Sequence, residues 1–291
     1  MGPQEPPGLF RSCLYVPAHQ TGWIDKAYRS AADAVILDLE DGVPAGHKLR
    51  ARANVAAITA EATAKPTYVR VNPVRSGLCQ DDVRAASGPG LVGIRIAKTA
   101  APPDVQAVDR VLTSVAGSAV LHPLIESAHA LEHIYAIATA SPRVAMIGLG
   151  ESDLWADLNT GPDSATMEAA RVRAVIAARA ADLPSPAQSV FPQVRDLDGL
   201  LRTSRAGKRL GFLGRMAIHP SQIPIIHDVY TPEAAEIAEA LEICEAEDQA
   251  RVQDRSIVIT PAGRMVGPPM ITAARATLRM ARTLDLIREA S

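Results

Sequence analysis

Short β-branched segments alternate with longer alanine-rich segments along most of this 291-residue chain. The short segments have the length and composition of buried strands, and the alanine-rich segments have the pattern of helices. The predicted strands are Ser12–Val16, Ala34–Leu39, Thr67–Val71, Val92–Ala97, Ala119–Ile125, Val144–Ile147, Ala187–Phe191 and Gly211–Ile218. Strands that alternate with helices form parallel sheets, and eight such units fit a closed barrel of about 250 residues. We therefore predict an α/β fold, a (β/α)8 TIM barrel.

An open, doubly wound sheet is the alternative for alternating strands and helices. Such sheets typically begin with a glycine-rich turn that binds a nucleotide phosphate. The pattern GxxxxGK[ST] does not occur in this chain, and GxGxxG occurs once, at Gly88-Pro89-Gly90-Leu91-Val92-Gly93. That match runs into the predicted strand Val92–Ala97, whereas a phosphate-binding turn follows a strand and opens a helix. The sequence therefore disfavours a nucleotide-dependent enzyme on an open sheet.

The pattern changes at both ends of the predicted barrel, residues 11–229. Residues 1–10 are polar and proline-rich, and we expect them to be disordered. Residues 230–291 form a C-terminal helical extension, with helices predicted at Thr231–Arg251 and Pro268–Glu289 and two short apolar runs within Ser256–Val266. This extension has too little apolar surface to stand alone as a domain. We expect it to contact its own barrel or a neighbouring subunit, which favours a homo-oligomer, a trimer or a hexamer.

Charge and aromatic content exclude several classes of function. The chain has 30 Lys and Arg against 32 Asp and Glu, a formal net charge of −2. It therefore lacks the basic field that holds nucleic acid or an anionic membrane surface. Aromatic residues make up only 3% of the chain, which also disfavours stacking onto single-stranded bases.

Targeting signals and a disulfide framework are not expected. No apolar stretch reaches the roughly 20 residues of a spanning helix, and the first residues lack a signal-peptide pattern. Cys13, Cys79 and Cys244 are far apart and show no CxxC spacing, which fits a reducing compartment. We expect a cytoplasmic, soluble protein that binds neither a membrane nor nucleic acid.

Charged residues follow several of the predicted strands. The strand ends carry Asp38-Leu39-Glu40-Asp41-Gly42, Arg70-Val71-Asn72, Lys98, Glu126, Gly148-Leu149-Gly150-Glu151-Ser152-Asp153 and His219-Pro220. Because barrel strands end at one face, these side chains should meet at one rim, where barrel enzymes place their active sites. Carboxylates so crowded repel one another unless a cation compensates.

Glu126 and Asp153 end neighbouring strands and supply hard oxygen donors. No cysteine or paired histidine nearby favours zinc, so Mg²⁺ that keeps several waters or substrate oxygens is the predicted cation. The alternative is that each carboxylate caps the helix that follows it. Both interpretations are open for each residue alone, and the occurrence of the pair favours the metal.

Arg70 lies at a strand end where an unpaired cation would be costly to bury. It can clamp a carboxylate or enolate oxygen, or form an internal ion pair with Asp38 or Glu40, and the two roles are compatible. For Glu40 and Asp41, hydrogen bonding to Arg70 or to metal-bound water is favoured over direct ligation. For Lys98 we favour substrate binding or charge pairing over a Schiff base, because its neighbours do not establish a desolvated amine.

These strand ends together resemble the citrate lyase β-subunit and malyl-CoA lyase family, within the HpcH/HpaI aldolase superfamily. The resemblance rests on seven motifs in family order: Arg11-Ser12-Cys13-Leu14-Tyr15-Val16-Pro17, Asp38-Leu39-Glu40-Asp41-Gly42-Val43, Val69-Arg70-Val71-Asn72, Ile94-Arg95-Ile96-Ala97-Lys98, Leu124-Ile125-Glu126, Gly150-Glu151-Ser152-Asp153-Leu154 and Ile218-His219-Pro220-Ser221-Gln222-Ile223. It covers the chain from about Arg11 to the C-terminal helix.

The resemblance implies a barrel that binds a CoA or acyl-carrier-protein thioester and makes or breaks the carbon–carbon bond beside the thioester carbonyl. Glu126 and Asp153 match the Mg²⁺ ligands of the family, and Arg70 matches the arginine that steadies the carbonyl or enolate oxygen. Backbone amides would hold the carboxylate of a 2-oxo acid. The amides concerned are those of Gly150, Glu151 and Ser152.

The chain departs from the family pattern at its C-terminal segment. Many lyases of the group carry an aspartate there, within Gly-x-Met-hydrophobic-Asp-x-Pro, that is thought to act as acid or base across a subunit boundary. Gly267 stands at that position here. Arg215 also replaces a family lysine, and Ala97 replaces the proline of the usual Ile-Pro-Lys.

His19 is the candidate substitute for the missing acid or base. It follows the first predicted strand and can transfer protons near neutral pH, although a loop histidine is more often only solvated. His219 is expected to be a structural hydrogen-bonding residue in its loop, and His122 a satisfied core residue.

The leading hypothesis is a Mg²⁺-dependent lyase that cleaves a 3-hydroxyacyl-CoA thioester, such as malyl-, citramalyl- or citryl-CoA, through an enolate stabilised by the metal and Arg70. Its products would be a 2-oxo acid and an acyl-CoA. Hydrolysis of the thioester and aldol cleavage of a free hydroxy acid at the same site are alternatives. A non-catalytic CoA-binding paralogue is a further alternative, which Gly267 favours.

Overall fold

The computed structural model describes residues 10–253 and 258–287, and the chain divides into two compact units after Val229. Of the segment predicted to be disordered, residues 1–9 lie outside the described residues.

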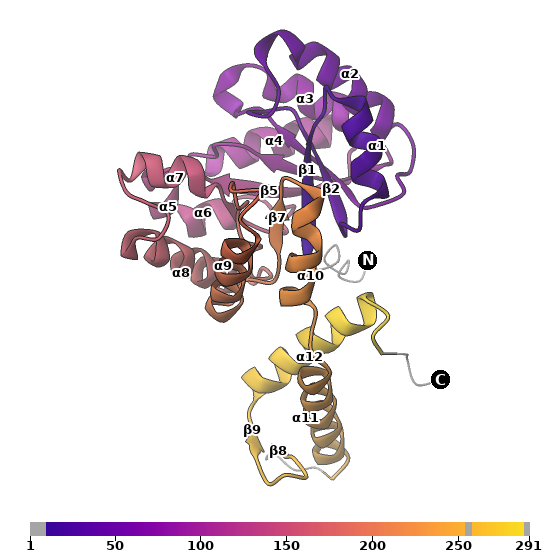
Figure 1. Ribbon diagram of the computed structural model, residues 1–291, viewed down its shortest axis with the longest axis vertical. Coiled ribbons are helices and arrows are strands. Elements are labelled where there is room, and N and C mark those ends of the chain that lie inside the picture. Colours follow the sequence, from indigo (N-terminus) through magenta and orange to yellow (C-terminus); the bar gives the residue numbers. More distant parts are fainter. Residues whose placement is uncertain (1–9, 254–257, 288–291) are drawn as a thin grey trace. The chain divides into compact units, whose positions relative to one another are not determined.

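A curled, seven-stranded parallel sheet forms the centre of the first unit, and helices surround it (Figure 1). The strands are β1 (Ser12–Pro17), β2 (Ala34–Asp38), β3 (Thr67–Val71), β4 (Leu91–Ile96), β5 (Val120–Ile125), β6 (Gly148–Leu149) and β7 (Arg215–Ala217), in the order β6-β5-β4-β3-β2-β1-β7. Their apolar composition suits a sheet covered on both faces. In β2 the side chains of Val35, Ile36 and Leu37 are completely buried. The sheet is typical of a TIM-barrel-like α/β fold.

The predicted seventh strand, Ala187–Phe191, is not a strand of this sheet. It forms a single parallel bridge, from Gln188 to Arg215 of β7. Pro186 and Pro192 flank the segment, and proline has no N–H with which to extend a ladder. In place of the predicted (β/α)8 barrel, residues 10–229 therefore form a parallel sheet of seven strands, with no eighth strand among them.

The predicted sixth strand is also displaced along the chain. Val144 forms one bridge to Leu121, and β6 begins only at Gly148. Beyond β6, the Glu151 N–H donates to Ser189 Oγ at 3.3 Å. A main-chain to side-chain bond thus links the end of β6 to the segment at residues 187–191.

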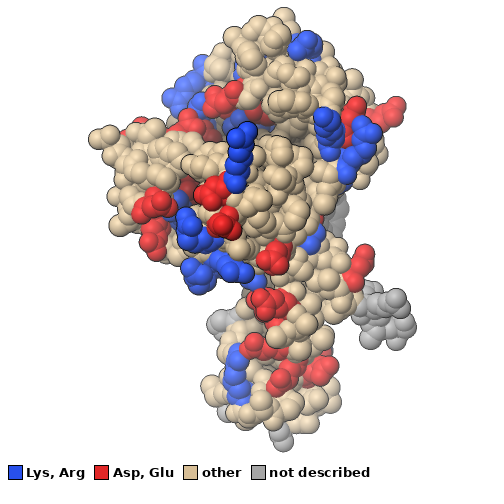
Figure 2. All heavy atoms as spheres, in the orientation of Figure 1, with Lys and Arg blue, Asp and Glu red and all other residues tan. Residues whose placement is uncertain are grey.

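The helices of the first unit are α1 (Thr21–Arg29), α2 (Lys48–Thr59), α3 (Cys79–Ala86), α4 (Pro102–Ser114), α5 (Ala128–Glu132), α6 (Ile134–Ala138), α7 (Glu151–Asp157), α8 (Ala165–Ala180), α9 (Leu197–Leu210) and α10 (Ile223–Tyr230). Their buried residues recur at helical spacing. In α4, for example, Val105, Val108 and Leu112 are buried on one side of the helix, which faces the sheet. The end of α9 is set by Gly211, whose φ of 99° favours glycine. Acidic and basic side chains are interspersed on the face drawn in Figure 2.

The second unit pairs two helices with a two-stranded hairpin. Its elements are α11 (Ala234–Val252), β8 (Val258–Ile259), β9 (Met265–Val266) and α12 (Pro268–Thr283). Ile243, Ala250, Val266 and Leu278 belong to its own buried core. The predicted helix Pro268–Glu289 ends earlier, at Thr283, and residues 288–289 lie outside the described part. None of the described helices is long and apolar enough to cross a membrane.

Candidate active site

A cavity of about 640 Å³ opens where the strands of the first unit end. The predicted site residues in its lining are Asp41, Arg70, Glu126, Gly150, Glu151, Ser152 and Asp153. They come from the ends of β2, β3, β5 and β6, so the fold brings together residues that lie far apart in the sequence. Glu40 and Lys98 are not lining residues themselves, but Glu40 contacts Arg70 and Lys98 contacts Asp41 in the lining.

Arg70 is fixed by carboxylates at the cavity wall. Its Nε and Nη2 donate to the two oxygens of Asp38, both at 2.7 Å, and its Nη1 lies 3.2 Å from Glu40 Oε2. Its guanidinium also lies over the ring of Tyr15, 5.0 Å from the ring centre. Burial lowers the pKa of Arg70, but the Asp38 charge and hydrogen bonds outweigh it and hold that pKa well above its usual value. Arg70 is thus a permanent, oriented cation in the cavity lining.

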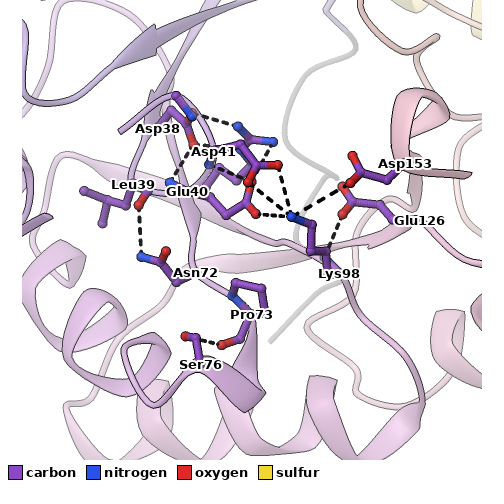
Figure 3. Close-up of polar contacts among 12 residues, drawn as sticks. Asp38, Leu39, Glu40, Asp41, Asn72, Pro73, Ser76, Lys98, Glu126 and Asp153 are labelled. Carbon is purple, nitrogen blue, oxygen red and sulfur yellow. Dashed lines mark hydrogen bonds and ion pairs between the residues drawn. The ribbon is translucent and has the colours of Figure 1, made fainter. Parts of the chain in front are cut away.

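Lys98 joins three carboxylates across the cavity rim (Figure 3). Its Nζ lies 2.8 Å from Glu40 Oε1, 3.1 Å from Asp41 Oδ2 and 3.8 Å from Asp153 Oδ1. Although burial alone would lower the pKa of Lys98, hydrogen bonds to Glu40 and Asp41 raise it above its usual value. A lysine held charged in this way pairs charges and does not supply the neutral amine of a Schiff base.

Glu40 and Asp41 are neighbours with opposite pKa shifts. Burial raises the pKa of Glu40, against the opposing charge of Arg70. Burial also works to raise the pKa of Asp41, but hydrogen bonds with Glu40 and Lys98 lower it overall. Asp41 therefore stays ionised more readily than its more buried neighbour.

Glu126 is the most strongly perturbed carboxyl group of the cavity. Burial raises its pKa to about 8; Arg70 opposes this rise, and the negative charge of Asp153 adds to it. Its Oε2 accepts the backbone N–H of Lys98 at 3.0 Å. Lys98 has a φ of 48°, and this left-handed conformation directs its N–H to Glu126 while its side chain reaches the opposite rim.

Gly150 makes room for the Glu126 carboxylate. A Cβ atom at position 150 would lie 2.4 Å from Glu126 Oε1, closer than real Cβ contacts come. Only glycine allows the end of β6 to approach Glu126 so closely.

Neither Glu126 nor Asp153 caps the helix that follows it. Ser127 caps α5, since its side chain accepts the N–H of Ala130. The helix α7 already begins at Glu151, so Asp153 lies within its first turn. The capping alternative for this pair of carboxylates is therefore wrong, and both side chains are available at the cavity.

The donor set at Glu126 and Asp153 fits a divalent cation. Asp153 is half-exposed, whereas Glu126 is 6% exposed and has a carboxyl whose ionisation is opposed by its surroundings. Cation charge relieves such a carboxylate pair. In residues 10–253 and 258–287, no group of three or more His, Cys, Asp or Glu side chains could hold a metal. Two oxygen ligands completed by water or substrate are typical of Mg²⁺.

The three predicted amide donors at residues 150–152 differ in their use. The Gly150 N–H donates to the Ile125 carbonyl at 3.0 Å, and the Glu151 N–H is held by Ser189. The Glu151 side chain turns to Arg171 of α8 and forms an ion pair there. Ser152 lies in the first turn of α7, where N–H groups have no partner within the helix.

His19 is not among the residues that line the cavity. Its ring stacks on His47, with centroids 5.2 Å apart, and its Nε2 lies 3.1 Å from Gln20 Nε2. Burial and the neighbouring His47 lower the pKa of His19. This position does not favour a direct role in proton transfer within the cavity.

The other two histidines differ from one another. His219 lines the cavity, and its Nδ1 accepts the Ser221 N–H at 3.2 Å, which is the structural role expected of it. His122 is buried, as predicted, and its Nδ1 lies 3.5 Å from Arg95 Nη1. Its Nε2 has no hydrogen-bond partner among the described residues, so the ring is only partly satisfied.

The predicted ion pair of Arg70 is confirmed with both Asp38 and Glu40. Asp38 also accepts the N–H groups of Glu40 and Gly42. A further cavity residue was not predicted. Arg95 lines the cavity beside Tyr15, and an arginine within the apolar run of β4 was the signal for it.

Residues 11–220 match the model of a family described as HpcH/HpaI aldolase/citrate lyase. The citrate lyase subunit beta of Haemophilus influenzae is 30% identical over 286 residues, which cover 94% of this chain and 98% of that protein. A (3S)-malyl-CoA thioesterase of Cereibacter sphaeroides is 32% identical over 279 residues, covering 94% of this chain and 95% of that protein.

Solved structures show the same similarity. The protein CitE of Mycobacterium tuberculosis, in complex with magnesium, acetoacetate and coenzyme A, has a TM-score of 0.71 and 26% identity. The match covers 94% of this chain and 98% of that one. The citrate lyase beta subunit of M. tuberculosis, complexed with oxaloacetate and magnesium, has a TM-score of 0.63 and 26% identity, over 77% of this chain and 98% of that one.

Proposed function

Since the chain belongs to the HpcH/HpaI aldolase/citrate lyase family, we propose that it is a Mg²⁺-dependent carbon–carbon lyase acting on a 3-hydroxyacyl-CoA thioester. Malyl-, citramalyl- and citryl-CoA are substrates of this kind. The observation that carries the proposal is the buried Glu126 carboxyl, with its pKa raised to about 8, beside Asp153 in a cavity that also contains Arg70.

Glu126 and Asp153 would hold Mg²⁺ together. When bound, Mg²⁺ supplies positive charge that stabilises an oxyanion as it forms. Relatives solved with magnesium and small oxo acids support this cofactor.

The reaction breaks the bond between C2 and C3 of the acyl chain. The 3-hydroxyl loses its proton and becomes the carbonyl of the 2-oxo acid, while the electron pair of the broken bond passes to the thioester as an enolate. Protonation of the enolate at C2 then gives the acyl-CoA. Arg70, which Asp38 and Glu40 orient, would stabilise the enolate oxygen.

The proton of the 3-hydroxyl needs an acceptor in the cavity. Asp41 lines the cavity, is 56% exposed, and has a lowered pKa that keeps it ionised. We assign the acceptor role to Asp41, with Lys98 holding its carboxylate in place. His19, which lies outside the cavity lining, is the weaker candidate.

The test is an assay of the purified protein with Mg²⁺ and a panel of 3-hydroxyacyl-CoA esters, which follows the 2-oxo acid and free thiol separately. We expect 2-oxo acid to form without free thiol, and the rate to be lost in Glu126→Gln. Absence of 2-oxo acid with every ester would contradict the lyase.

Thioester hydrolysis is the second candidate, because a (3S)-malyl-CoA thioesterase is 32% identical over nearly the whole chain. The same assay distinguishes it, since hydrolysis releases free thiol. A free hydroxy-acid aldolase would instead produce 2-oxo acid from a substrate without CoA.

The non-catalytic alternative rests on Gly267. This residue precedes α12 and offers no side chain for proton transfer. A protein of that kind would bind CoA esters without forming either product, so the assay excludes it as soon as one product appears.

We also propose that the protein is a cytoplasmic homo-oligomer, a trimer or a hexamer, in which the second unit contacts a neighbouring subunit. The β8–β9 hairpin of that unit exposes Ile259 and Met265, which are 59% and 71% accessible. Apolar side chains of this kind favour a covered surface. Size-exclusion chromatography with light scattering tests this, and a monomer would contradict it.

A further inference from the structure

We propose that Arg95 is the anchor for a second carboxylate in the substrate, so that the cavity selects a dicarboxylic 2-oxo acid fragment over a monocarboxylic one. The inference deepens the proposed function and rests on it. It is carried by a buried guanidinium in the cavity lining that none of the described carboxylates neutralises.

Arg95 lies inside the sheet, on the same face as Arg70. The register pairs Arg95 of β4 with Arg70 of β3 and with His122 of β5. Residues paired across parallel strands direct their side chains to the same side. The two arginines therefore approach one cavity from adjacent strands, but their surroundings differ.

Arg70 is neutralised, whereas Arg95 is not. Arg70 forms a two-point ion pair with Asp38. Arg95 is 3% exposed, and its partners are the Tyr15 hydroxyl, 3.0 Å from Nε, and His122 Nδ1, 3.5 Å from Nη1. Neither partner is a carboxylate, and burial and the charge of Arg95 hold the pKa of His122 well below its usual value.

A buried cation without a counter-charge is costly, and an anionic ligand removes that cost. The Nη2 of Arg95 has no hydrogen-bond partner among the described residues and is not enclosed by protein. Planar guanidinium groups bind carboxylates through parallel hydrogen bonds. A substrate carboxylate is therefore the ligand that this position suits.

Contacts with two glycines of the same segment show how deep Arg95 lies in the cavity relative to Glu126. A Cβ at Gly148 would lie 3.0 Å from Arg95 Nη2, and a Cβ at Gly150 would lie 2.4 Å from Glu126 Oε1. Because alternate residues of a strand share a face, these two contacts are separated by about 7 Å along the strand. Arg95 is thus one layer below the proposed metal ligands.

That separation suits a short dicarboxylic acid. Its oxo-acid end would lie at Glu126 and Asp153, and its second carboxylate would reach Arg95 past the apolar side chains of Leu124 and Leu149. A ligand that ends in a methyl group would leave the guanidinium without a counter-charge. The cavity would then favour the dicarboxylic acid because binding the other ligand leaves the Arg95 guanidinium buried and unpaired.

The test measures binding by isothermal titration calorimetry to the full chain loaded with Mg²⁺. The probes are oxaloacetate and 2-oxobutyrate, in which a methyl group replaces the second carboxylate. We expect the wild type to bind oxaloacetate at least about tenfold more tightly, since charge-assisted hydrogen bonds are the strong ones. In Arg95→Met this preference should disappear, with the affinity for 2-oxobutyrate retained.

Two further variants make the result specific. Gly148→Ala keeps Arg95 but fills the space beside its Nη2, so it should also weaken oxaloacetate selectively, even if Arg95→Met does not fold. Arg84→Met, at an exposed arginine of α3, is the matched control and should keep the wild-type preference.

The outcomes separate this inference from the proposed function. A wild type that binds both acids equally, or an Arg95→Met variant that still prefers oxaloacetate, overturns the role of Arg95 and leaves the lyase proposal standing. A Mg²⁺-loaded wild type that binds neither acid overturns both.

Discussion

Replacing Glu126 with glutamine should stabilise the metal-free protein, and the gain should grow with pH. In the folded chain the pKa of Glu126 is raised from 4.5 to about 8, mainly by burial. The folded state therefore binds this proton more tightly than the unfolded state. The stability contributed by the neutral carboxyl is fully present below pH 4.5 and is lost as the pH rises to about 8.

The pKa gives the size of the effect. A rise from 4.5 to about 8 corresponds to roughly 5 kcal/mol, at about 1.4 kcal/mol for each pH unit. Glutamine cannot ionise, so the unfolding free energy of Glu126→Gln should not fall in this way as the pH rises. The difference in unfolding free energy between variant and wild type should therefore grow with pH, up to this order.

The assay is urea unfolding at a series of pH values in the presence of a chelator. Glu61→Gln, at an exposed position, serves as the control and should follow the wild type. Added Mg²⁺ should stabilise the wild type but not Glu126→Gln, since only a protein that binds the ion gains stability from it. A difference in unfolding free energy between Glu126→Gln and wild type that does not change with pH would contradict this prediction.

Three further substitutions test separate parts of the site. Asp38→Asn should lower kcat about 100-fold in steady-state assays, because Arg70 loses the pair that orients it; an unchanged kcat would contradict this. Gly150→Ala should weaken Mg²⁺ binding about tenfold or more in a titration, since its Cβ displaces the Glu126 carboxylate; wild-type affinity would show that the close approach is not required. Gly267→Asp, at a helix N-cap position that aspartate suits, should raise lyase turnover above that of the wild type, and an unchanged rate would weaken the case for an acid or base at that position.

The sequence alone was sufficient to predict the strands that consist of an uninterrupted run of apolar residues. β2 and β5 were predicted within one or two residues, because such runs in a parallel sheet are buried on both faces. The segment at residues 187–191 has the same local pattern, but forms only one bridge. Its failure to form a strand depends on the flanking prolines and on neighbours distant in the sequence.

The site was predictable where its residues end strands, and not where they act through distant partners. Glu126 and Asp153 were found from their positions after β5 and β6. The bond between Arg95 and Tyr15 joins residues 80 positions apart, and no spacing in the sequence indicates it. The role of Asp153 likewise depended on the first residue of α7, which is Glu151. A sequence pattern predicts the start of a short helix only to within a residue or two.

The most direct test of the central claim is an anomalous difference map from crystals soaked in Mn²⁺ as a substitute for Mg²⁺. We expect one strong peak in the cavity, about 2.1 Å from a carboxylate oxygen of Glu126 and of Asp153, with water or substrate oxygens completing the coordination. A cavity without a peak, with Glu126 held only by the Lys98 amide and Asp153 facing only the Lys98 ammonium, would contradict it.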